Sequence, residues 1–172
     1  LFINEWGMEQ IVRDTRIATL YEGTTGIQAL DLLGRKILLS KGANLKFLTK
    51  EIFSFCKDFG PISKNPHKKQ MFPFIAPLFK LLAEWQLLTF RVMTGAAKDR
   101  DYVGSASVDY VMYSGYVMMA FMWAKMAQAA FEKLATGEGD TEFYQAKVQT
   151  AEFYFDRILP RTKVHASTMV KK

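Results

Sequence analysis

The feature that most constrains the fold of this chain is a helical spacing of apolar residues along nearly its whole length, with glycine and proline placed between the periodic stretches. Apolar residues at positions i, i+3, i+4 and i+7 form one face of an α-helix, whereas a half-buried strand needs alternation, which is absent at useful length. Apolar residues make up 49% of the chain, enough to form a core. The pattern predicts an all-α fold, an up-and-down antiparallel helical bundle with short loops.

Six helices are predicted, each with an apolar stripe and a stop or start residue at its ends. They are expected at about 8–16, 25–42, 43–59, 71–98, 107–134 and 140–159. The expected stripes are Ile27, Leu30, Leu33 and Ile37 in the second helix, Leu45, Leu48, Ile52, Cys56 and Phe59 in the third, and Leu78, Leu82, Trp85, Leu88 and Val92 in the fourth. The fifth helix is apolar nearly all round, which favours the centre of the bundle.

Several local signals refine these boundaries. Thr25-Gly26-Ile27-Gln28 reads as a capping box, and Asp140 as an N-cap. Pro73 and Pro77 are expected only in or near the first turn of their helix. Residues 17–23 are expected to be irregular, residues 62–70 to form a loop, and the tail after Arg161 to be frayed or docked only through Val164.

The helices divide into two predicted units. Residues 1–42 are interpreted as the end of one unit, and residues 43–172 as a separate helical unit packed on it.

Charge and cysteine content restrict the class of protein. The formal net charge is +6 and the pI is about 9.4, but the basic residues are scattered, which favours a solvated face over a phosphate-binding patch and is compatible with an anionic ligand. The single cysteine, Cys56, excludes an internal disulfide, fits a reducing compartment and is interpreted as a small core residue. We expect no secretory leader, and the longest uncharged stretch, 110–124, is shorter than the about 20 residues that span a bilayer.

Common catalytic constellations are not indicated. His67 and His165 have no cysteine or carboxylate at ligand spacing, so no metal site is predicted, and neither has a nucleophile that the sequence places beside it. The remaining candidate is Glu22, a carboxylate just ahead of a helix N-terminus, where the helix dipole favours its charged form. From periodicity alone, an ordinary acid at a helix start remains the favoured interpretation.

The wider stretch around Glu22 resembles a known family. Residues 8–28, MEQIVRDTRIATLYEGTTGIQ, closely resemble the acyl-CoA dehydrogenase signature, in which an Arg-Asp pair precedes Ile, Tyr-Glu-Gly-Thr and Ile-Gln. Residues 29–36, ALDLLGRK, together with 107–110, 121–126 and 151–161, resemble the bacterial branch with an additional C-terminal helical domain. Residues 1–42 then resemble the end of the dehydrogenase's own C-terminal helical domain, and residues 43–172 the appended domain.

This resemblance implies roles for six residues. Glu22 matches the catalytic base that removes the α-proton of an acyl-CoA thioester while the β-hydride passes to FAD. Tyr21 and Gly23 match substrate-binding positions, and Thr24, Thr25 and Gly26 match the run that touches FAD. The family often has Gln at the position of Gly26, and a glycine offers no side-chain contact there. Arg13 and Asp14 are expected to form a local ion pair.

The resemblance also implies partners and leaves alternatives open. It implies an electron-transfer flavoprotein as acceptor, a homo-oligomer and a bacterial cytoplasmic location. The chain alone is expected to be inactive, with Glu22 exposed, because the family's upstream domains complete the flavin site. The alternatives are a non-catalytic helical module for subunit assembly, which is compatible with the enzyme reading, and a DNA-binding flavoprotein of the same family, which only the basic pI supports.

Overall fold

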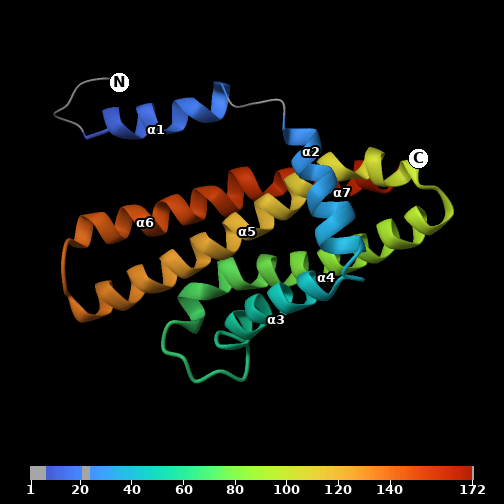
Figure 1. Ribbon diagram of the computed structural model, residues 1–172. Coiled ribbons are helices and arrows are strands. Elements are labelled where there is room, and N and C mark those ends of the chain that lie inside the picture. The colour runs from blue at the N-terminus through green and yellow to red at the C-terminus, as the bar shows by residue number, and fades with distance from the viewer. Residues whose placement is uncertain (1–6, 21–23, 172) are drawn as a thin grey trace.

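The computed structural model describes residues 7–20 and 24–171, with only the backbone described at residues 19 and 20. The described residues form helices and no strand. In chain order these are α1 (Glu9–Leu20), α2 (Thr25–Leu30), the π-helical η2 (Asp31–Leu38), α3 (Ala43–Lys57), α4 (Lys68–Lys98), α5 (Asp101–Thr136), α6 (Thr141–Phe153), the π-helical η3 (Tyr154–Ile158), the 3-10 turn η4 (Leu159–Arg161) and α7 (Thr162–Met169). Helices α3, α4, α5 and α6 run alternately up and down (Figure 1). The predicted all-α antiparallel bundle is confirmed.

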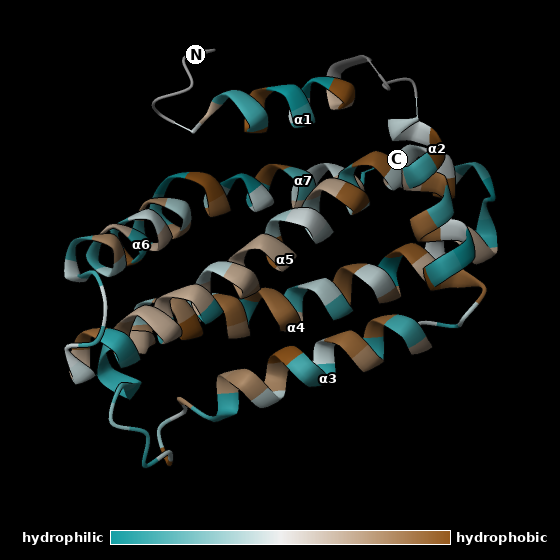
Figure 2. Ribbon diagram, turned by 60° about the vertical axis from the view of Figure 1, so that its left-hand side comes forward, coloured by the Kyte–Doolittle hydropathy of each residue, from teal (hydrophilic) through white to brown (hydrophobic). Residues whose placement is uncertain are grey.

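Helix α5 forms the centre of the bundle. It packs against α2, η2, α4, α6 and α7. Figure 2 shows hydrophobic colouring along most of α5, whereas α1 and α6 carry many hydrophilic positions. Its inner face includes Tyr110, Tyr113 and Val117, all fully buried. The predicted central position of this helix is confirmed, since its apolar surface is stable only when other helices cover it.

Two tyrosines of α5 link the core to α4 through polar atoms. The Tyr110 hydroxyl lies 2.9 Å from Thr89 Oγ1, and the Tyr113 hydroxyl lies 2.9 Å from Glu84 Oε2. Burial raises the pKa of Tyr110 to about 12, and it raises the pKa of Tyr113 as well. Both phenols therefore stay neutral at physiological pH and hydrogen-bond within the core, as buried polar groups must.

The connection between α4 and α5 depends on a close approach at Gly95. A Cβ at this position would lie 2.7 Å from the Tyr102 ring, closer than real Cβ contacts come. The absence of a side chain lets the ring of Tyr102 lie against the backbone of α4. This approach holds the last turn of α4 beside the first turn of α5.

Other predicted boundaries are confirmed. Gly137 ends α5 in the left-handed region, with φ 68°, where glycine is favoured. Asp140 caps α6, its side chain accepting hydrogen bonds from the backbone N–H groups of Glu142 and Phe143 at 2.9 and 3.1 Å. All five stripe residues predicted for α4 are buried, as are four of the five predicted for the third helix, with Leu48 partly buried against the core.

The proline prediction is wrong. Helix α4 begins at Lys68, so Pro73 and Pro77 lie inside it rather than in its first turn, and residues 68–70 are helical. Each proline removes one backbone hydrogen bond. Proline 73 and the Lys69 carbonyl that it leaves without its helical donor are on the exposed side, where water can bind. Burial of Phe74 and Leu78 on the opposite face offsets the loss.

Three further boundaries differ from the prediction. Helix α1 extends to Leu20, so residues 17–20 are helical, whereas residues 21–23 lie outside the described part. Helix α5 starts at Asp101, six residues early, because the Asp99 side chain accepts a hydrogen bond from the Asp101 backbone at 3.0 Å. These starts depend on individual side-chain contacts that apolar periodicity does not report.

The second predicted stripe is only half correct. Leu33 and Ile37 are buried, but Ile27 is 66% and Leu30 46% exposed, and Ala29 is the buried residue of α2. The chain changes from α-helix to π-helix at Asp31. Because hydrogen bonds in a π-helix span one more residue, the face that meets the core shifts relative to α-helical spacing.

The C-terminal tail is docked rather than frayed. After Pro160, which lies in η4, the chain continues as α7. Val164 is 61% exposed, whereas Met169 is buried and its carbonyl accepts a hydrogen bond from the Tyr102 hydroxyl at 3.2 Å. The prediction of docking only through Val164 is therefore wrong, because α7 turns its other side to α5.

Helix α4 is also the one described helix long and apolar enough to cross a bilayer by length and composition. Of its most apolar window, 44% is buried inside the protein. Its buried residues, which include Leu78, Leu82 and Trp85, belong to the core shared with α3 and α5. This burial fits a core helix of the bundle.

Burial along α4 predicts a contrast between two leucines. Leu78→Ala removes a side chain with no exposed surface and should lower the free energy of unfolding of the 172-residue chain by about 2–5 kcal/mol. Leu87→Ala, at a position 52% exposed, should change it by about 0.5 kcal/mol. Urea denaturation of both variants checks this, and equal losses would contradict the placement of the core.

Candidate functional site

The segment singled out by the sequence joins α1 to α2. Thr24 and the first residues of α2, Thr25 and Gly26, are described, whereas Tyr21, Glu22 and Gly23 lie outside the described residues. The roles given to all six by the resemblance stay predictions. The described half of the motif forms the beginning of a helix.

Thr24 is the N-cap residue of α2. Its carbonyl accepts a hydrogen bond from the Gln28 backbone N–H at 2.7 Å, and its side chain makes no capping hydrogen bond. The predicted capping box, with Thr25 as the cap, is wrong by one residue. Thr25 is already in the first turn, so the backbone contact from Thr24 closes that turn.

The start of α2 is open to the outside. Thr25 and Gly26 are exposed, and a Cβ built on Gly26 meets no atom within 4 Å. A flat ligand can therefore reach the Gly26 backbone without displacing a side chain of the described residues. Within two turns the chain becomes π-helical η2, a conformation frequent near functional sites.

Helix α1 lies away from the bundle and takes no part in its main helix–helix contacts (Figure 1). The Arg13 guanidinium pairs with Glu9 one turn earlier, and Gln10 donates to Asp14 at 2.8 Å. The predicted Arg13–Asp14 pair is therefore wrong, because these neighbours point to different sides of the helix. Apolar residues of α1, including Met8, Ile11 and Ile17, are exposed.

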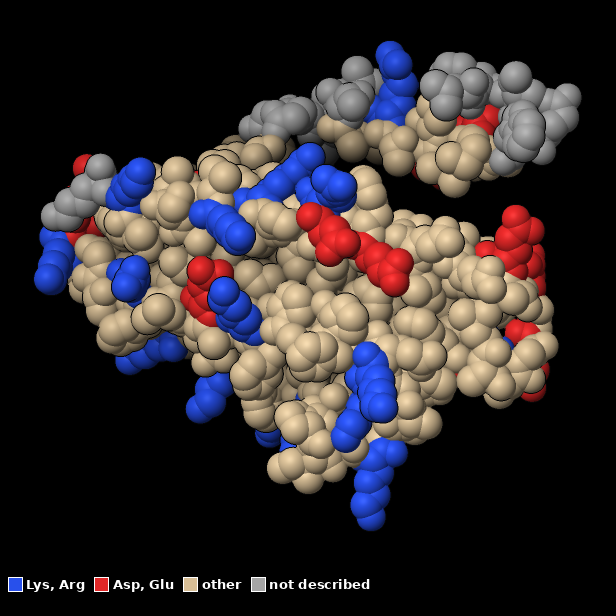
Figure 3. Space-filling model, turned by 180° about the vertical axis from the view of Figure 1, so that it is seen from behind, with Lys and Arg blue, Asp and Glu red and all other residues tan. Residues whose placement is uncertain are grey.

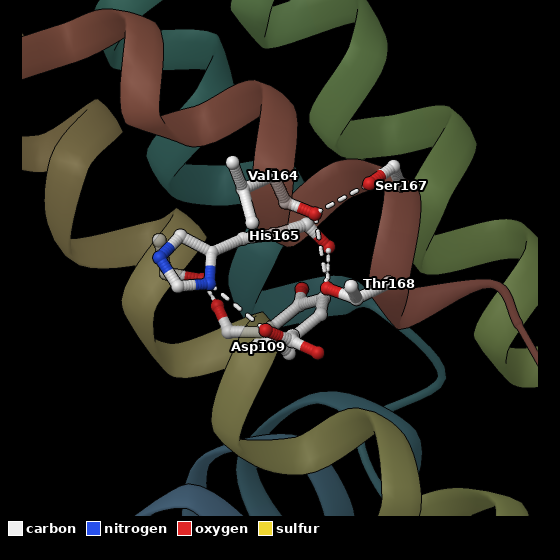
Figure 4. A network of polar contacts seen from close by, with 7 residues as sticks. Asp109, Val164, His165, Ser167 and Thr168 are labelled. Atoms are coloured by element: carbon white, nitrogen blue, oxygen red, sulfur yellow. Dashed lines mark hydrogen bonds and ion pairs between the residues drawn. The ribbon is translucent and has the colours of Figure 1, made fainter.

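A histidine that the sequence left in the tail acquires a carboxylate partner. His165 Nδ1 on α7 lies 2.8 Å from Asp109 Oδ1 on α5, and the His165 ring stacks on Tyr116 with 5.7 Å between centroids (Figure 4). Both side chains of the pair are mostly buried. The pair joins residues 56 positions apart, which local spacing cannot reveal.

The surroundings of this pair supply no nucleophile. The nearby hydroxyls of Ser167 and Thr168 donate to the Val164 carbonyl at 2.8 and 2.9 Å, as ordinary helix contacts (Figure 4). A catalytic triad needs a hydroxyl or thiol hydrogen-bonded to the histidine. The His165–Asp109 pair therefore serves to hold α7 on α5.

Two further observations bear on reactive groups. Cys56 is 2% exposed, and burial raises the pKa of its thiol to about 12, which confirms that it is an inert core residue rather than a nucleophile. Among the described residues, no three His, Cys, Asp or Glu side chains converge as a metal site.

Charges on the face opposite to that of Figure 1 are dispersed. Figure 3 shows Lys and Arg as separate groups on this face, mixed with acidic residues and divided by wide uncharged areas. Nucleic-acid backbones are bound by continuous basic stripes. The distribution on this face fits the predicted solvated surface.

Comparison with known proteins places the chain in a family. The family described as acetyl-CoA dehydrogenase C-terminal like matches residues 48–172. The chain is 34% identical over 158 residues to the 3-methylmercaptopropionyl-CoA dehydrogenase of Ruegeria pomeroyi, and 32% identical over 169 residues to the broad-specificity linear acyl-CoA dehydrogenase FadE5 of Mycobacterium tuberculosis. A butyryl-CoA dehydrogenase of Syntrophomonas wolfei is 26% identical over 174 residues.

The coverage of these alignments is asymmetric. Each includes 92% of this chain but only 25–26% of the relative, so the chain spans about a quarter of the length of the curated relatives it matches. The chain belongs to the acetyl-CoA dehydrogenase C-terminal-like family, and its recognition as the C-terminal part of an acyl-CoA dehydrogenase is confirmed.

The docking of α7 gives a testable consequence. Asp109→Ala removes the His165 partner and should weaken the docking of α7 by about 1 kcal/mol, which speeds tryptic cleavage after the exposed Lys163 by about fivefold. The exposed Asp156→Ala serves as the control. Unchanged cleavage in the Asp109 variant would show that the pair does not hold α7.

Proposed function

We propose that the protein carrying this chain is an FAD-dependent acyl-CoA dehydrogenase that oxidises acyl-CoA to trans-2-enoyl-CoA. The observation that carries the proposal is the Tyr-Glu-Gly-Thr motif at 21–24, directly ahead of α2, in a chain of this family. An electron-transfer flavoprotein is the proposed acceptor. The proposed enzyme is a homo-oligomer in the bacterial cytoplasm, with no membrane span and no nucleic-acid partner.

Glu22 is the proposed catalytic base. Removal of a weakly acidic α-proton requires a carboxylate whose pKa is raised towards neutrality by desolvation. The developing enolate oxygen requires hydrogen bonds, and the backbone N–H of Glu22 is one proposed donor. Tyr21 walls the acyl pocket in this proposal, and the Gly23 backbone lies beside the thioester.

The start of α2 is the proposed contact with the cofactor. FAD, when bound, supplies the acceptor for the β-hydride. Thr24, Thr25 and Gly26 would hold it from one side, and the exposure of Thr25 together with the empty space around Gly26 fits the approach of a flat ring. Their role is to position the ring, because none of them is a base of suitable strength.

The 172-residue chain alone is proposed to be inactive. A desolvated base needs walls on every side, and α1 and α2 leave apolar residues such as Ile11, Ile17 and Ile27 exposed. The remaining dehydrogenase domains would cover these residues and close the flavin site. Without that cover, the pKa of Glu22 is not expected to shift.

Substitution of the base tests this proposal in the full-length protein. Glu22→Gln keeps the size of the side chain but cannot take a proton, so acyl-CoA-dependent dye reduction should fall by at least about 10²–10⁴-fold while the flavin absorbance is retained. Glu51→Gln on α3 is the matched control and should leave turnover unchanged. Retained turnover in the Glu22 variant would refute the proposed mechanism.

A second candidate function is that of an assembly module, which is compatible with the first. Along the outer side of α5, from Gly104 to Met122, every exposed position is uncharged. The large apolar residues on this side are Val108, Met112, Met119, Met122 and Met126, each 36–48% exposed. Methionines adapt well to partner surfaces, and a continuous apolar stripe of this kind is typical of protein interfaces.

This stripe predicts an effect of charge on oligomeric state. Met119→Lys places a charge in the middle of the stripe and should reduce the mass of the full-length protein measured by light scattering, because the ammonium would be desolvated on assembly. Gln145→Lys, on the exposed side of α6, should leave the mass unchanged. An unaltered oligomer in the Met119 variant would exclude this side of α5 from the interface.

A further inference from the structure

An apolar groove of about 770 Å³ lies on the outside of the bundle between α3 and α4. Its volume falls within the range of about 300–1,000 Å³ usual for ligand pockets. Side chains from both helices form its walls, namely Phe53, Phe72, Ile75, Ala76 and Phe79, and Phe59 lies at one end. It is far along the chain from the Tyr-Glu-Gly-Thr motif, and the proposed dehydrogenase chemistry does not use it.

The groove exposes large aromatic residues to solvent. Phe72 is 64% exposed, Phe79 51% and Phe53 48%, and the rings of Phe53 and Phe79 lie 5.7 Å apart. Single exposed apolar residues are ordinary, but three phenylalanines around one groove form a contiguous patch. Burial of such a patch against an apolar ligand is favourable.

One end of the groove is basic. Lys57, Lys68 and Lys69 are among its lining residues, and no carboxylate is. The Lys68 ammonium donates to the carbonyls of Pro61 and Ser63 at 3.0 and 3.1 Å, which leaves one of its three N–H groups for another acceptor. These contacts hold a positive charge at the mouth of the groove.

The two lysines of α4 also break a local rule. Lys68 and Lys69 occupy the first turn of a helix of 31 residues that has no acidic residue in that turn. The positive pole of the helix dipole disfavours cations there. Local rules are most often broken where a site requires it, and an anion bound at this end would reverse the unfavourable term.

We propose that this groove binds an anionic amphiphile with a single acyl chain, such as a long-chain carboxylate. The chain lies along Phe53, Phe72 and Phe79, and the carboxylate lies beside Lys68 and Lys69. The combination of an apolar wall and one basic end matches the two parts of this ligand. Binding is non-covalent, and the lining Cys56 is buried with a raised thiol pKa, so it takes no part in chemistry.

Charge argues against a second copy of the chain as the occupant. In a symmetric dimer, the same patch meets itself across a twofold axis. Copies of Lys57, Lys68 and Lys69 would then share one desolvated interface with no carboxylate among the lining residues to compensate them. Like charges held together in this way oppose association.

The test is calorimetric titration of the full-length protein with dodecanoate below its micellar concentration. We expect one saturable site in this groove. Lys68→Gln/Lys69→Gln should weaken binding about tenfold or more, whereas Lys80→Gln/Lys98→Gln, an equal change of charge on the same helix, should not. Ala76→Trp, which fills the groove, should abolish this binding, and the exposed Ala97→Trp should not.

Other arms separate competing results. Dodecyltrimethylammonium, with the same chain and the opposite charge, should bind at least about tenfold more weakly. The Glu22→Gln protein should bind dodecanoate normally, so this outcome does not depend on the proposed dehydrogenase mechanism. The absence of binding, equal binding in all folded variants, or a loss of oligomer mass in the Ala76→Trp protein would each overturn the proposal, the last by showing that the groove is a protein interface.

Discussion

The structure depends on the burial of one apolar helix. Helix α5 has 36 residues and an inner face that runs from Tyr102 to Ala130, a surface that water does not tolerate. Helix α4 covers one side of it, and α6 and α7 cover another, while α2 and η2 lie over its first half. The antiparallel order follows, because a long helix is covered most economically by its chain neighbours folding back on it.

The segment with the dehydrogenase motif is attached to this core through a few residues. Leu33 and Ile37 of η2 are part of the core, whereas α1 lies outside it. The proposed base therefore lies in the connection between a helix that packs on the bundle and a helix that does not. Such an arrangement suits a residue whose environment comes from another domain, and it leaves the division of the chain at Gly42 a proposal.

Much of the bundle could be predicted from the sequence, because periodicity reports which face is buried. The stripe of α4 was correct for this reason, and the stops at Gly42, Gly60 and Gly137 follow from backbone chemistry. Periodicity does not report tertiary partners. The His165–Asp109 pair and the docking of α7 through Met169 join distant residues, and the two prolines within α4 are tolerated only because of what its other face buries. Of the candidate site, the motif could be recognised, but the environment of Glu22 belongs to no local pattern.

Hydrogen exchange of the 172-residue chain tests the central claim, that the bundle is built around α5 while α1 lies outside it. Amides of α5 between Tyr110 and Ala124 should exchange only through global unfolding, and those of α1 should exchange orders of magnitude faster, through local opening. Protection of α1 equal to that of α5 would contradict the account, because it would make α1 part of the same cooperative unit.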